Sequence, residues 1–431
     1  MITKNTLSSL AKNNVNTNEI MSSGVSIFFS NWVATIVKLL TTLAIVRLSG
    51  AEAKGVQVYV VAYSAIASII LGFGLSASVS YSMNSGLITS SNLMRRIIIH
   101  FFVVTLLLLI FSPWLISFVP PLNSTSISET SIGLWVIATC PVLMLNDLLN
   151  TMAVASGRIR NYSLQINSES IVFGLTSALF ALFGNLNSQT VLISCFMGYI
   201  AGASIGWFGL RRFFNTTDSV GAVQQPIRSM YRFALQGFPS ILINGIQRRV
   251  EVVVIGPLLG VTQLAYYSVG AQGFQVLMSI PRALTGLLTR SICRAHKNDA
   301  PALALAVTKK LIASMSAIAI LASLTGYVAV PFVYGGEFKA AVAPFALLVW
   351  AAVFSGGSAC LQTLCTGQGR PGLVSVNVLA TALIKILLLM ILVTSFGIVG
   401  CAVATLVSAI CGLLLQWWQN QRLTAPDITP V

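Results

Sequence analysis

Eight charged residues lie inside long apolar stretches of this sequence: Lys38, Asp147, Glu169, Arg248, Arg249, Glu251, Arg282 and Lys385. A charge at bilayer depth costs at least about 2.5–3.5 kcal/mol, and such residues usually face a helix-bundle interior or a water-filled cavity. Five of the eight are basic and three are acidic. The basic excess predicts that this set holds an anion, provided that the apolar stretches cross a membrane.

The composition is that of an integral membrane protein. Of the 431 residues, 56% are hydrophobic and only 8% are charged, and the mean hydropathy is +0.86. Soluble domains carry about 25% charged residues. The net charge of +15 comes from basic residues scattered singly and in pairs, without the block of Lys and Arg that is typical of nucleic-acid binding.

Twelve apolar stretches are long enough to cross a bilayer as helices, which takes about 20 residues each. They lie near 24–48, 55–82, 94–119, 131–155, 163–184, 189–210, 232–257, 262–290, 309–334, 340–366, 373–396 and 398–419. Their length favours helices over barrel strands, which alternate over about ten residues. We therefore predict an all-α integral membrane protein with twelve transmembrane helices.

The basic residues between the spans predict the orientation of the chain. With a cytoplasmic N-terminus, seventeen of the 25 Lys and Arg residues lie inside and only Arg47, Lys54 and Lys339 lie outside. Cytoplasmic loops carry such an excess, so both termini are expected in the cytoplasm. The expected parts are an N-terminal segment 1–23, an N-lobe 24–212, an inter-lobe loop 213–231, a C-lobe 232–420 and a tail 421–431.

An internal repeat relates the two halves. A shift of 210 residues superimposes Gly50 on Gly260, Pro121 on Pro331, Gly157 on Gly367, Arg160 on Arg370, Gly202 on Gly412, Trp207 on Trp417 and Arg212 on Arg422. Six spans per half give a parallel repeat, whose pseudo-twofold axis runs along the membrane normal with the substrate path between two six-helix lobes. The same shift places Lys38 opposite Arg248, so we expect both to border one central space.

Two interpretations of the intramembrane charges remain open, internal pairing and a cationic cavity. Arg248 and Glu251 are three residues apart and would pair on one helix face. Asp147 and Glu169 would pair with Arg158 or Arg160, or take part in ion coupling, and Arg282 would either snorkel to the cytoplasmic edge or join the cavity. Lys38 and Lys385 have no acid three or four residues away, and they favour a water-filled cavity with an anionic substrate.

No pattern in the chain indicates an enzyme or a bound cofactor. It has two His residues, no HExxH, Walker or nucleophile-elbow motif, and short loops on both sides of the predicted membrane. Its seven Cys residues lie in or beside apolar runs without CxxC spacing, which is typical of packing rather than of metal binding. We predict no catalytic residue, no metal and no cofactor.

Three stretches resemble the multidrug/oligosaccharidyl-lipid/polysaccharide flippase superfamily, in its polysaccharide-transport branch of Wzx-type O-antigen flippases. They are "LAIVRLSGAEAKGVQVYVVAYS", "RVEVVVIGPLLGVTQLAYYSVGAQ" and "TLCTGQGRPGLVSVNVL". The matching residues are Gly50, Gly55, Arg249, Glu251, Gly260, Tyr267, Gly367 and Arg370. Tyr59 is displaced from the position that the pattern would give it. The resemblance covers nearly the whole chain and identifies a superfamily better than a substrate.

The resemblance implies two six-helix lobes around a central cavity that opens to one side of the membrane at a time. The cargo would be an oligosaccharide repeat unit on undecaprenyl diphosphate, for O-antigen, lipopolysaccharide or a related surface polysaccharide, moved from the cytoplasmic to the periplasmic leaflet. Membrane lipids, and the polymerase and chain-length regulators of the same pathway, would be its partners. The five basic residues in the spans agree with a diphosphate, because Arg binds phosphate through two hydrogen bonds and Lys acts as a point charge.

Three alternatives remain. A drug/cation antiporter of the same superfamily would be expected to present an acid to its cargo on the first helix, which here carries Lys38 and no acid. A membrane-embedded polysaccharide polymerase or ligase would need a sizeable outside loop with catalytic Arg or His. A peptidoglycan lipid flippase would have fourteen spans rather than twelve.

Overall fold

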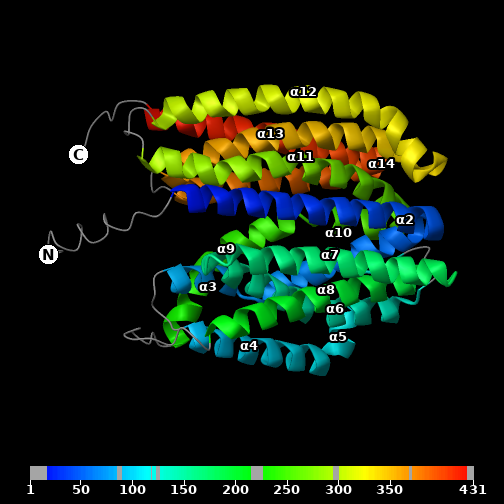
Figure 1. Cartoon of the computed structure of the whole chain (residues 1–431). Coiled ribbons are helices and arrows are strands. Elements are labelled where there is room, and N and C mark those ends of the chain that lie inside the picture. Colours follow the sequence, from blue (N-terminus) through cyan, green and yellow to red (C-terminus); the bar gives the residue numbers. More distant parts are fainter. Residues whose placement is uncertain are drawn as a thin grey trace.

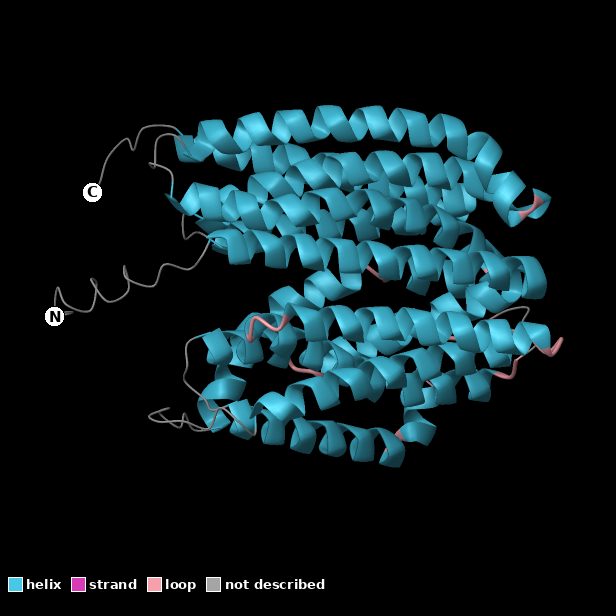
Figure 2. Ribbon diagram, viewed as in Figure 1, coloured by secondary structure: helices cyan, strands magenta, loops and turns pink. Residues whose placement is uncertain are grey.

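The computed structural model describes residues 17–84, 90–117, 119–122, 127–214, 227–294, 300–367 and 371–424. Within these ranges the chain consists of helices joined by short loops, without a strand (Figure 2). The helices are α2 (Thr17–Leu71), α3 (Leu75–Asn84), α4 (Ser90–Ile110), α5 (Ser112–Ile116), α6 (Glu129–Ala155), α7 (Ile159–Leu182), α8 (Ser188–Phe214), α9 (Ile227–Gln247), α10 (Val250–Leu259), α11 (Val261–Arg294), α12 (Ala300–Tyr334), η1 (Gly336–Ala341), α13 (Val342–Gly367) and α14 (Pro371–Thr424). The predicted all-α class is confirmed for this part of the chain.

Glycines bend the two longest helices into hairpins. The backbone of α2 leaves helical geometry at Gly50 (φ 79°, ψ 178°), and that of α14 does so at Gly397 (φ 56°, ψ −136°). Gly260 separates α10 from α11 with almost the same geometry as Gly50 (φ 85°, ψ 170°). Only glycine adopts such angles without strain. Two identical bends 210 residues apart support the register of the predicted repeat.

The helices form two groups, which lie one above the other in Figure 1. The lower group contains α4 to α8 and the upper group contains α11 to α14, with α9 and α10 between them. The first part of α2 packs on both α7 and α11, so it lies where the two groups meet. The described chain begins and ends on the same side of the molecule, at the left of Figure 1.

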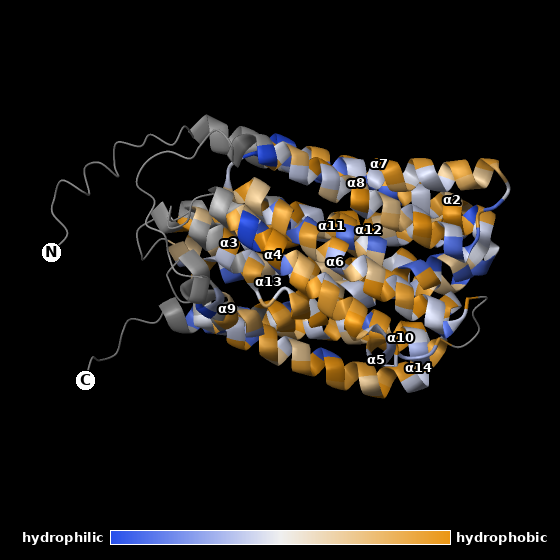
Figure 3. Cartoon of the chain, turned by 90° about the horizontal axis from the view of Figure 1, so that it is seen from below, coloured by the Kyte–Doolittle hydropathy of each residue, from blue (hydrophilic) through white to orange (hydrophobic). Residues whose placement is uncertain are grey.

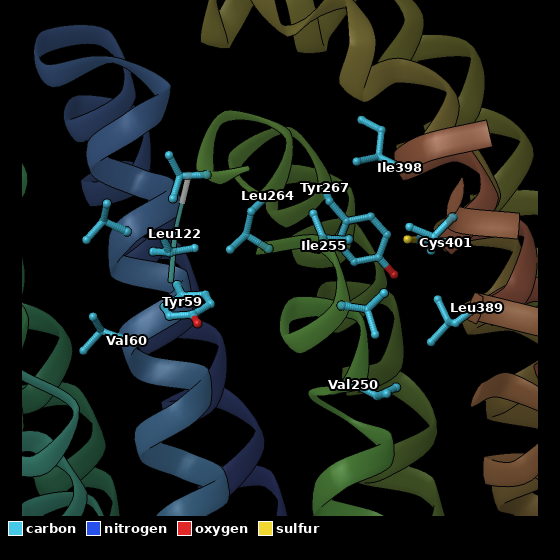
Figure 4. Close-up of a cluster of buried hydrophobic side chains, with 14 of the residues drawn as sticks. Tyr59, Val60, Leu122, Val250, Ile255, Leu264, Tyr267, Leu389, Ile398 and Cys401 are labelled. Carbon is cyan, nitrogen blue, oxygen red and sulfur yellow. The ribbon is translucent and has the colours of Figure 1, made fainter. Parts of the chain in front are cut away.

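The two groups are packed together on the side of the Gly50 and Gly260 bends. A Cβ atom added to Gly55 would lie 2.0 Å from the carbonyl oxygen of Val261, so α2 and α11 touch through their backbones there. Ala51 and Ala265, the repeat mates of Val261 and Gly55, also share one buried cluster. A larger apolar core surrounds this contact, with side chains such as Tyr59, Leu122, Ile255, Leu264 and Ile398 from both halves (Figure 4).

Seven helices of the described chain are long and apolar enough to cross a membrane. Two of these stretches, Phe29–Leu71 and Gly372–Gln421, span 43 and 50 residues and contain the hairpin bends, so each has the length for two crossings. Hydrophobic residues, orange in Figure 3, make up much of the helices that the figure shows. The segments 1–23, 213–231 and 421–431 lie largely outside the described residues, and the division into two lobes stays a prediction.

Candidate functional site

A cavity of about 1040 Å³ lies between the two groups of helices. Its walls come from α2, α6, α7, α8, α11 and the connection between α9 and α10. Among its lining side chains, five are basic and one is acidic: Lys38, Lys54, Arg248, Arg249, Arg282 and Glu169. The cavity is therefore strongly cationic.

Lys38 and Arg248, the repeat mates, line this same cavity. Lys38 pairs with Glu169 of α7, with 2.7 Å between Nζ and Oε1. The pair joins α2 to α7 and remains accessible, because the side chains of Lys38 and Glu169 are 47% and 14% exposed. Counting along the first span found no acid three or four residues from Lys38, and a partner 131 residues away cannot be found that way. The predicted pairing of Glu169 with Arg158 or Arg160 is wrong, because its carboxylate pairs with Lys38.

Arg248 and Arg249 lie at a break in the seventh predicted span. Helix α9 ends at Gln247 and α10 begins at Val250, and the two arginines form the turn between them. Neither guanidinium forms an ion pair within the described ranges. The positive end of the α10 dipole adds to their charge. Broken membrane helices present their termini to ions and anionic substrate groups, and the charges at this turn suit an anion.

Arg282 and Lys54 add positive charge to two further walls of the cavity, those formed by α11 and α2. Arg282 on α11 lines the cavity and donates to the Gln275 side chain at 2.7 Å. Lys54 on α2 is only 6% exposed, and its Nζ donates to Gln57 at 2.7 Å and to Thr42 at 3.2 Å. Neither basic residue has an ion-pair partner in the part of the chain that the structure describes.

Lys54, expected in the connection outside the first two spans, lies within α2, where it is buried and lines the cavity. The connection after the first span is a tight bend at Gly50 rather than a loop, so α2 turns back at once and carries Lys54 inward beside Thr42. A signal for the bend was present in the sequence, because the repeat matches Gly50 with Gly260 at the end of the first span of each half.

Lys385 does not line the cavity. It is 6% exposed, and its ammonium pairs with Glu251, which is also buried, and donates to the carbonyl oxygen of Gln247 at 3.0 Å. Its assignment to the cavity is therefore wrong. The predicted pairing of Glu251 with Arg248 is wrong for a related reason: α10 begins after Arg248, so the two residues do not share one helix face.

Asp147 on α6 is exposed and forms no ion pair within the described residues. It does not line the cavity. No three His, Cys, Asp or Glu side chains of the described chain lie close enough together to hold a metal ion. The cavity presents several positively charged hydrogen-bond donors to a ligand. Residues such as Gln57, Tyr162 and Gln272 add amide and hydroxyl groups.

Comparison with solved structures identifies the fold. No protein-family model and no curated protein matches the chain in sequence. The lipid II flippase MurJ, in an inward closed conformation, is similar with a TM-score of 0.68 and 13% identity, over 93% of this chain and 90% of that one. A MATE transporter variant from Vibrio cholerae gives 0.64 and 14%, over 95% and 97%. The chain has the fold of MOP-superfamily transporters.

A third similar structure, from Pyrococcus furiosus, concerns the polarity of the pocket. This MOP-superfamily transporter gives a TM-score of 0.65 and 13% identity, over 95% of this chain and 96% of that one. It is described as having a binding pocket of reverse polarity that suggests a different function. The predicted superfamily fold of a multi-pass membrane protein is thus confirmed, whereas the polysaccharide branch stays a prediction.

Proposed function

We propose that this protein is a flippase that moves oligosaccharide repeat units linked to undecaprenyl diphosphate from the cytoplasmic to the periplasmic leaflet. One observation carries the proposal. Four basic side chains line the cavity without an ion pair in the described residues, and the single acid of the wall is already paired with a fifth, Lys38. A cavity with this surplus of positive charge attracts an anionic head group and repels a cationic one.

The chemistry of the wall fits a diphosphate joined to sugars. Guanidinium groups bind phosphate oxygens through two parallel hydrogen bonds, and Arg248 and Arg249 supply two of them side by side. Amide and hydroxyl side chains on the same wall suit sugar hydroxyls. The volume of about 1040 Å³ is slightly above the range of about 300–1,000 Å³ for small-molecule sites, so it suits a cargo larger than a single ion.

The fold supplies a path for such a cargo. We propose twelve spans in two six-helix lobes, with both termini in the cytoplasm of a bacterial inner membrane and with the lipid tail in the bilayer while the head group crosses the cavity. In this orientation Gly50, at the end of the first span, lies on the periplasmic side. The packing of the two helix groups there would then close the cavity on the periplasmic side. Rocking of the lobes would close the other side in turn.

The second candidate is a drug/cation antiporter, because MATE transporters share this fold as well as MurJ does. Glu169 is the one cavity acid that would serve such a cargo. Its pairing with Lys38, next to four further basic side chains, disfavours a cationic ligand. The charge of the cavity therefore separates two functions that the fold does not.

A flipping assay tests the proposal. Purified protein in proteoliposomes is supplied with a fluorescent oligosaccharide on undecaprenyl diphosphate, and its exposure to an external quencher is followed. We expect Lys38→Ala and Arg248→Ala to abolish flipping, Lys38→Arg to retain it, and Asp147→Asn, which changes an acid outside the cavity, to leave it unchanged. Wild-type flipping in both alanine variants, or drug export with no lipid flipping, would contradict the proposal.

A further inference from the structure

The break between α9 and α10 removes hydrogen bonds that a membrane helix cannot easily lose. In a continuous helix the carbonyl of Gln247 would accept the N–H of Glu251. At the break the Arg249 amide bonds to Ile246, three residues back, and the Gln247 carbonyl accepts no backbone N–H from the described residues. In a bilayer such a group must find a partner inside the protein.

Lys385 supplies that partner from α14. Its Nζ donates to the Gln247 carbonyl oxygen at 3.0 Å and pairs with the carboxylate of Glu251, in the first turn of α10. One ammonium group therefore bridges the end of α9 and the start of α10. The Gln247 side chain also donates to Thr381, one turn before Lys385 on α14, at 3.4 Å.

Glu251 is fixed on the side away from the cavity. Its carboxylate accepts from Thr405 of α14 at 3.2 Å and from Tyr267 of α11 at 3.4 Å. Figure 4 shows the Tyr267 hydroxyl directed toward α14, where Leu389 and Cys401 lie. Neither Glu251 nor Lys385 lines the cavity. The acid closest in sequence to Arg248 and Arg249 is thus held where it does not neutralise them.

We propose that the Lys385–Glu251 pair is a positioning site, which bridges the helix break from behind and thereby presents Arg248 and Arg249 to the cavity. For the identity of the bound anion this inference rests on the proposed function. Lys385 and Glu251 do not touch the head group. They act through the backbone of residues 247–251, whose geometry decides where the two guanidinium groups point.

This role differs from that of an ordinary stabilising ion pair. Replacing a buried pair by apolar residues of similar size is often neutral or favourable for stability. The double variant Lys385→Met with Glu251→Leu therefore removes the bridge without leaving a buried charge unpaired. Exchanging the two residues (Lys385→Glu with Glu251→Lys) keeps an ion pair, but a carboxylate at position 385 cannot donate to the Gln247 carbonyl.

Two measurements on protein in nanodiscs test the inference: the affinity for undecaprenyl diphosphate, and hydrogen–deuterium exchange of the amides of residues 248–252. We expect Lys385→Arg, which keeps both bonds, to behave as wild type. The apolar double variant and the exchanged pair should bind about 10–100-fold more weakly, as sites do when a supporting partner is lost, and should exchange faster at the break. Gln416→Met, which removes a different buried polar group of α14, serves as the control and should keep wild-type binding.

Wild-type affinity or wild-type exchange in the apolar double variant would overturn the inference, and so would full recovery in the exchanged pair. If the wild type does not bind undecaprenyl diphosphate, the proposed function fails instead. The exchange measurement still decides the positioning role in that case, because it needs no ligand.

Discussion

Glu169 is the one cavity residue whose removal should strengthen binding of the cargo. It holds Lys38 at 2.7 Å, so an incoming phosphate must compete with its carboxylate for the ammonium group. Glu169→Gln keeps the shape of the side chain and removes the negative charge. We therefore expect the variant to bind the lipid-linked diphosphate more tightly than the wild type, and to flip it more slowly because release is impaired.

The size of the effect follows from the repulsion that is removed. Two like charges about 6 Å apart repel by about 3 kcal/mol at an effective dielectric constant of about 20. Solvent reaches this site, because the Lys38 side chain is 47% exposed, and it screens the repulsion between Glu169 and the phosphate. Interactions between exposed charges contribute about 1 kcal/mol or less. A gain of about 1 kcal/mol corresponds to roughly fivefold tighter binding, since about 1.4 kcal/mol is tenfold.

The assay is titration of undecaprenyl diphosphate into purified protein in nanodiscs, paired with the flipping assay on the same preparation. Asp147→Asn is the matched control, since it removes an acid that does not line the cavity, and it should change neither quantity. Weaker binding in Glu169→Gln would refute the reasoning. It would mean that Glu169 itself contacts the cargo or holds Lys38 in the orientation that the cargo needs.

Three further outcomes follow from the structure. Lys54→Met should weaken binding of the diphosphate several-fold while Lys54→Arg retains it, because the buried ammonium faces the cavity without an acidic partner in the described chain. Gly55→Ala should lower the melting temperature clearly, since its Cβ would meet the Val261 backbone at 2.0 Å, whereas Gly336→Ala, in open space, should not. Gly260→Ala should destabilise the protein by about 1–3 kcal/mol, because φ is 85° there, as measured by thermal unfolding in detergent.

Much of the fold could be predicted from the sequence, because in a membrane the hydrophobic length of a helix is set by the bilayer. Two of the helix bends fall at glycines that the repeat had singled out, Gly50 and Gly260, whereas the bend at Gly397 does not. The repeat also predicted that Lys38 and Arg248 border one central space, and both line the cavity. It carries no information about which side chains pair with them. Helix periodicity relates residues three or four positions apart, and it stops at a break such as the one after Gln247.

The pairings in the site could not be predicted for that reason. Lys385 and Glu251 are 134 positions apart, and Lys38 and Glu169 are separated by 131. Only the packing of α14 on α10 and of α2 on α7 brings these charges together. Lys54 was missed because a hydropathy scan marks a charged residue next to glycines as a loop. The tight bend at Gly50 returns it to the interior.

The central claim is that the unpaired cations of the cavity bind an anionic head group. Its most direct test is competition in the purified protein between undecaprenyl diphosphate and a lipophilic cation such as tetraphenylphosphonium. We expect saturable binding of the diphosphate that is lost in Arg248→Ala with Arg249→Ala, and no displacement by the cation. Saturable binding of the cation, with none of the diphosphate, would contradict it.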